Sequence, residues 1–149
     1  MASRIALVGK RAAGLSLQDW RHLAIAVKEL LIARIRHASQ PVGKILHDLE
    51  RLQSSDTRGE VDLARLSWAI GAAAAKVPWR SDCLLQAVAA DRWLRRCGMQ
   101  PKFFVGVQKE AGGQLEAHAW LRCGDVVVTG AHSRNFTTLM EPISRAVRE

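Results

Sequence analysis

The fold of this chain is decided by one stretch, Val77-Pro78-Trp79-Arg80-Ser81-Asp82-Cys83-Leu84-Leu85-Gln86-Ala87. Ser81 and Asp82 are favoured N-cap types, and the residues that follow are apolar or small at helical spacing. The pattern predicts a buried helix that runs to Arg95 or Arg96. Cys83 would then lie in the first turn, where unpaired backbone N–H groups and the helix dipole favour a negative charge such as a thiolate.

Three more helices are predicted ahead of this one. Their apolar residues recur at helical spacing over about Leu17–His37, Val42–Leu52 and Asp62–Lys76. Ser16 and Asp19 form a capping-box pattern before the first of them. The polar run 53–60 marks the expected boundary between an N-terminal helical segment, 1–60, and the remainder of the same domain, 61–149.

The pattern changes to strands after Pro101. Apolar runs separated by Gly-containing turns predict strands over 103–107, 115–122 and 126–129, with Gly124-Asp125 as a tight turn. Helices followed by a small antiparallel sheet give an α+β fold. We expect the helix of Cys83 to pack on this sheet.

Composition limits the function classes. The 149 residues are 48% hydrophobic, which suits one globular domain. The net charge is +8, but basic residues are scattered and aromatic residues make up only 5%, which argues against nucleic acid as a partner. The charge could instead attract an acidic peptide or protein.

The cysteines and the apolar runs set further limits. Cys83, Cys97 and Cys123 are widely spaced and form no CxxC pair, so neither a metal site nor a disulfide framework is expected, and no cofactor is implied. No apolar run approaches the roughly 20 residues that a membrane span needs. No secretory signal is recognisable, so a cytoplasmic location is expected.

Two residues suggest nucleophilic chemistry. A thiol nucleophile needs a stabilised thiolate, a base and donors for the oxyanion. Cys83 at a helix start offers the first, and His118 in a predicted strand offers the second. Trp79, Gln86 and Trp120 are candidates to line the site. From spacing alone, a buried structural cysteine and a half-exposed surface histidine explain these residues better than a catalytic pair does.

Several motifs resemble the transglutaminase-like leader peptidase of lasso peptide biosynthesis, a family with a papain-like core. They are Pro78-Trp79-Arg80-x-x-Cys83-Leu84-x-Gln86-Ala87, Leu94-x-Arg96-x-Gly98, Gly106-Val107 and Ala117-His118-Ala119-Trp120-Leu121. They span about residues 77–130 in the expected order, and the chain is similar to the stand-alone, split form of the family.

The resemblance implies a cysteine protease that cuts a precursor peptide at its leader–core junction. Cys83 would attack the carbonyl, and His118 would move the proton. A separate leader-recognition protein and an ATP-dependent macrolactam cyclase would be partners. The basic, apolar helix Leu17–His37 is the expected docking surface, although packing within its own domain or an interfacial membrane helix would give the same pattern. The alternatives are a non-catalytic scaffold of the same pathway and a Cys/His acyl transferase.

The family has an acidic residue about a dozen positions after the histidine, and this chain departs from it. Positions 129–131 read Thr-Gly-Ala. If Gly124-Asp125 is a two-residue turn, Thr129 lies one diagonal step from His118 on the same face and could orient the imidazole. Asn135 is the second candidate, and a plain dyad of Cys83 and His118 is the third possibility.

Overall fold

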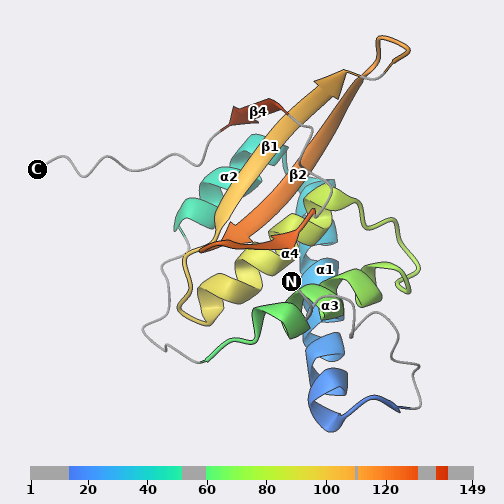
Figure 1. Ribbon diagram of the computed structural model, residues 1–149, viewed down its shortest axis with the longest axis vertical. Coiled ribbons are helices and arrows are strands. Elements are labelled where there is room, and N and C mark those ends of the chain that lie inside the picture. Colours follow the sequence, from blue (N-terminus) through green and yellow to red (C-terminus); the bar gives the residue numbers. More distant parts are fainter. Residues whose placement is uncertain (1–13, 52–59, 110, 131–136, 141–149) are drawn as a thin grey trace, which may run out of the picture.

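The computed structural model describes residues 14–51, 60–109, 111–130 and 137–140. Within them, helices precede strands, as predicted (Figure 1). The elements are α1 (Leu17–Ser39), α2 (Val42–Arg51), α3 (Leu63–Ala74), α4 (Cys83–Arg96), β1 (Lys102–Lys109), β2 (Leu115–Cys123), β3 (Val126–Thr129) and β4 (Thr137–Met140). The predicted α+β fold is confirmed.

Helix α4 begins and ends where the sequence predicts. The Asp82 side chain caps it by accepting a hydrogen bond from the backbone N–H of Leu85 at 3.1 Å. At the other end, Gly98 adopts a φ of 79°, and the N–H of Met99 donates to the carbonyl of Leu94 at 3.0 Å. This is the Schellman ending that a glycine after the last turn favours. Every residue from Ala87 to Leu94 is buried, which makes α4 the central helix.

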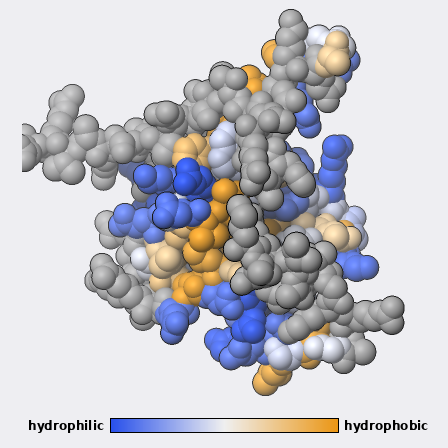
Figure 2. Space-filling model, in the orientation of Figure 1, coloured by the Kyte–Doolittle hydropathy of each residue, from blue (hydrophilic) through white to orange (hydrophobic). Residues whose placement is uncertain are grey.

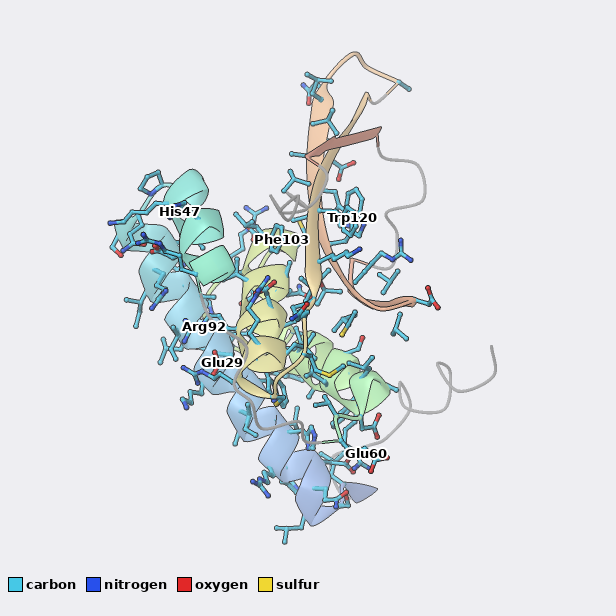
Figure 3. All side chains as sticks on the ribbon, turned by 90° about the vertical axis from the view of Figure 1, so that its left-hand side faces the viewer. Glu29, His47, Glu60, Arg92, Phe103 and Trp120 are labelled. Atoms are coloured by element: carbon cyan, nitrogen blue, oxygen red, sulfur yellow. The ribbon has the colours of Figure 1, made fainter. Side chains whose placement is uncertain are left out.

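The helices and the sheet form layers around α4. One side of α4 contacts β1, β2 and β3, and other sides contact α1 and α3. Figure 3 shows α1 on the side of α4 away from the sheet. Apolar residues of these layers make one core cluster, which includes Leu30, Leu66, Ile70, Leu94 and Leu121. In Figure 2, apolar atoms also reach the surface near the place where α4 meets the lower end of the sheet.

A buried group of charges joins α1 to α4. Glu29 is 1% exposed and accepts hydrogen bonds from Arg92 at 3.1 Å and from Arg96 at 2.7 Å. Burial lowers the pKa of Arg92 below its ordinary value, although the charge of Glu29 opposes the shift. Removing one partner of such a pair leaves an uncompensated buried charge, so Glu29 ties the two helices together.

Asp91 of α4 is a second buried charge. It pairs with Arg95, whose Nη2 also donates to the carbonyl of Pro101 at 3.4 Å. Burial raises the pKa of the Asp91 carboxyl from 3.8 to about 6, although Arg95 and Arg92 oppose the shift. The folded chain therefore binds this proton more tightly than the unfolded chain does.

We expect Asp91 to make the fold more stable as the pH falls from about 7 to about 4, by at most about 3 kcal/mol. Above the folded pKa the buried carboxylate costs its full desolvation, and below the unfolded pKa both states are protonated. Urea unfolding across this range measures the effect. Asp91→Asn should lose this increment, whereas Asp125→Asn, at an exposed turn position, should keep it. An unchanged pH slope in Asp91→Asn would contradict the assignment.

The described strands form one antiparallel sheet in the order β3-β2-β1-β4. Ala119 and Leu121 of β2 face the helices and join the core, with Phe103 packed against it. Trp120 points to the other face, as Figure 3 shows, and stacks on Phe104 with ring centroids 5.5 Å apart. Strand β4 was not predicted as a strand; it pairs with β1 from Val105 to Val107.

The predicted register between β2 and β3 is correct only at the turn. Cys123 pairs with Val126 as expected, but a bulge follows, and Leu121 pairs with Thr129. Directly paired residues share a face, so Thr129 lies on the side of Leu121 and not on that of His118. The prediction that Thr129 shares the face of His118 was wrong because the bulge adds one residue, Val128, to β3 and brings Thr129 opposite Leu121.

Candidate active site

Cys83 is the first residue of α4 and is partly buried against the core. The first intrahelical bond runs from the N–H of Gln86 to the carbonyl of Asp82 at 3.1 Å. The amides of Cys83 and Leu84 therefore precede the hydrogen-bonded ladder, at the positive end of the helix dipole. This position suits an atom that carries negative charge during a reaction.

The loop before α4 is attached to its first turn. The side-chain amide of Gln86 donates to the carbonyl of Ser81 at 3.0 Å, which gives Gln86 a structural contact in addition to its predicted place beside the site. Trp79 packs against the core. Within the described part of the chain, the buried Nε1 of Trp79 and Oγ of Ser81 have no hydrogen-bond partner. Both groups lie within four residues of Cys83 in the sequence.

The other two cysteines have different surroundings. Cys123 is buried in the core and Cys97 is partly buried at the end of α4. Burial raises the pKa of both thiols above the ordinary value. Among the described residues, no group of His, Cys, Asp and Glu side chains could hold a metal ion.

We expect iodoacetamide at about neutral pH to modify Cys83 before Cys97 and Cys123, by roughly tenfold or more in rate. The reason is that the thiolate is the reactive form, and burial disfavours it at the other two cysteines. Peptide mapping by mass spectrometry measures the order. In Cys83→Ser the fast phase should disappear. A fast phase located at Cys97 or Cys123 would contradict this.

His118 lies on β2, opposite Gly106 of β1, and is partly buried. Its ring stacks near that of Trp120, with centroids 6.3 Å apart and planes inclined by 22°. Its Nε2 lies 3.1 Å from the position that a Cβ on Gly130 would occupy. Gly130, just after β3, has a φ of +73°, which favours glycine. Because glycine has no Cβ, position 130 leaves room for the imidazole of His118.

Helix α4 and strand β2 run in the same general direction (Figure 1). The end of α4 lies near the start of β1, and Lys102 of β1 pairs with Arg122 of β2. A helix of 14 residues is about 21 Å long, the length of roughly six strand residues. His118 alternates with Ala119 and Leu121, which face the helices, so its side chain lies on the face of β2 that carries Trp120.

The candidates for orienting His118 differ in position. The Oγ1 of Thr129 is buried and has no hydrogen-bond partner among the described residues. Asn135 lies outside the described residues. Asp82 caps α4, and Asp125 is exposed in the turn between β2 and β3. Gly130 was not among the predicted site residues, although a glycine after a strand is itself a signal of close approach.

The arrangement of helices and sheet is the fold shared by papain-like cysteine proteases and acyltransferases. The family model of the transglutaminase-like superfamily matches residues 26–141, and the chain belongs to that superfamily. Searches of curated proteins and of solved structures found no match. Of the helices in the described ranges, none combines the length and the apolar character that crossing a membrane requires.

Proposed function

We propose that this protein is a cysteine endopeptidase that removes the leader from a ribosomally made lasso peptide precursor. The observation that supports the proposal is the position of Cys83 in the first turn of α4, a helix that contacts β2, the strand of His118. The motifs between 77 and 130 supply the substrate class through their resemblance to the leader peptidases. Membership of the transglutaminase-like superfamily supports the chemistry.

The reaction follows from the roles of the two residues. His118 takes the thiol proton, and the sulfur of Cys83 attacks the carbonyl carbon at the leader–core junction. The backbone N–H of Cys83 is a donor to the oxyanion. The C–N bond then breaks, and His118 gives its proton to the amine of the core. Water, deprotonated by His118, hydrolyses the leader thioester and restores the thiol.

The imidazole is oriented in this proposal by a neutral group. Positions 129–131 offer no carboxylate, and Thr129 is on the face of Leu121. Asn135, or a water or backbone carbonyl in a plain dyad, remains for this role.

Asn135→Ala and Thr129→Val should each lower the cleavage rate by less than the roughly 10⁴-fold loss that neutralising a triad aspartate causes in a serine protease. An equally large loss from Asp82→Asn or Asp125→Asn would reveal a carboxylate triad.

The proposed partners are the precursor peptide, a leader-recognition protein and an ATP-dependent macrolactam cyclase, and the proposed location is the cytoplasm.

The test incubates the purified protein with the precursor, with and without the recognition protein. Mass spectrometry should find the free leader acid and the core amine, formed faster when the recognition protein raises the local concentration of the leader. Full-rate cleavage by the isolated protein would contradict the role of the recognition protein. Transfer of the leader to an added amine in preference to water would identify an acyl transferase, and no product under any condition would indicate a scaffold.

A further inference from the structure

Helix α1 carries an exposed apolar stripe along its whole length. Its members are Leu17, Trp20, Ala24, Val27, Leu31 and Ile35. Leu17 is 86% exposed, Trp20 53% and Ile35 58%. Their spacing of three and four residues places them on one side of the helix. Apolar atoms also appear in Figure 2 at the foot of the molecule, where the N-terminal end of α1 lies.

The stripe lies opposite the face that α1 uses for packing. Ala26, Leu30 and Ala33 are fully buried, and α1 contacts α3 and α4. Figure 3 shows α1 as the outer layer, beyond α4 from the sheet. A helix that packs on one domain needs one apolar face, and α1 has two. The core explains only the inner face.

The charges beside the stripe have one sign. Arg21 and Lys28 follow one side of it and Arg34 lies on the other, and all three are exposed. Both acidic residues of α1, Asp19 and Glu29, are buried, at 0% and 1% exposure. Asp19 pairs with Arg65 at 3.2 Å, and Glu29 pairs with Arg92 and Arg96 of α4. The outward face of α1 is therefore apolar with only basic charges at its margins.

We propose that this outward face docks an amphipathic helix of a protein partner, in which acidic residues flank the apolar side. Positions 17, 20, 24, 27 and 31 follow the alternating spacing of a coiled-coil seam, and Arg21 and Lys28 occupy equivalent flanking positions in it. A partner with glutamates at the facing positions pairs with both. The stripe is about 27 Å long, which matches a helix of roughly five turns. Trp20 is a large aromatic anchor of the kind that dominates interfaces.

A second copy of this chain is a poor occupant of the same surface. Two α1 helices packed through their stripes would bring Arg21, Lys28 and Arg34 against like charges from the other copy. Like charges at flanking positions oppose pairing. The proposal does not depend on protease activity, because it concerns a surface on the side of α4 away from the sheet.

The experiment uses the full-length protein and two synthetic helical peptides of about three heptads each. Both peptides have leucine at the seam, and one has glutamate at the flanking positions where the other has lysine. In fluorescence anisotropy, the glutamate peptide should bind at least about tenfold more tightly than the lysine peptide and weaken in about 0.5 M salt. Leu31→Glu should abolish binding. Leu115→Glu, an equally polar change at an exposed leucine of β2, should leave it unchanged.

A charge reversal gives the sharpest outcome. The double variant Arg21→Glu, Lys28→Glu should prefer the lysine peptide. The proposal is overturned if the two peptides bind equally, or if Leu31→Glu binds like the parent. It is also overturned if only vesicles of phosphatidylcholine and phosphatidylglycerol, roughly 3:1, bind the face. A dimer in sedimentation that Leu31→Glu dissociates would assign the surface to a second copy instead. If the full-length protein binds the glutamate peptide but does not cleave the precursor, the proposed function alone is contradicted.

Discussion

Cys83→Ala should lower precursor cleavage by roughly 10⁴-fold or more, while the fold is kept. Without the sulfur no thioester forms, and the remaining backbone donors at the start of α4 have no nucleophile to serve. Cys83 is only partly buried at N1 of the helix, so alanine creates little empty space there. Rates measured by chromatography, with circular dichroism as the check on folding, test this.

Two further variants make the result specific. His118→Ala should lose activity to a similar extent, because residues that act as one unit are not additive, and the double variant should be no worse than either single one. Cys97→Ala, a matched control at the other end of α4, should retain activity. Cleavage at the parental rate by Cys83→Ala would rule out the nucleophile. A double variant far worse than both single ones would show that the two residues act separately.

Gly130→Ala should impair both stability and cleavage. An alanine Cβ would lie 2.6 Å from Cβ of Trp120, 2.9 Å from the carbonyl oxygen of Ala119 and 3.1 Å from Nε2 of His118. The first two contacts are too short for the hairpin to keep its geometry, so β3 and the imidazole must move. We expect at least about a tenfold loss of activity, since a small displacement of a reacting group has a large effect on rate.

Gly124→Ala is the matched control for Gly130→Ala. Gly124 also has a positive φ, of +59°, but a Cβ there would meet nothing within 4 Å. Gly124→Ala should lower the free energy of unfolding only by the backbone strain, roughly 1–2 kcal/mol. Gly130→Ala should lower it by that amount and by about 1–3 kcal/mol more because of overpacking. Equal losses of unfolding free energy in the two variants would show that crowding around Gly130 is unimportant.

The sequence was most informative where local signals decide the structure. Asp82 and Gly98 define the ends of α4 because capping needs only neighbouring backbone groups. The capping box of Ser16 and Asp19 at the start of α1 is confirmed for the same reason. The sequence could therefore predict that Cys83 lies in the first turn of α4.

Features that depend on tertiary contacts were less accessible. The run Val126-Val127-Val128 has no polar residue to define which side faces the core, so the bulge and the true neighbour of Thr129 could not be read from it. Helix α1 is apolar on two sides, and only packing against α3 and α4 shows which side is buried. The closeness of Gly130 to His118 likewise depends on how two strands meet.

The buried contacts of Glu29 have a practical consequence for anyone shortening this chain. A truncation that begins at Glu60 would remove α1 and leave Arg92, which is 4% exposed, without its carboxylate. It would also uncover apolar surface of α3 and α4 to solvent. Such a fragment should aggregate on expression, and adding back a synthetic peptide of residues 14–40 should restore solubility only if the peptide keeps Glu29. Tags and fusion partners should therefore be attached on the N-terminal side of α1 and not inserted between α1 and α4.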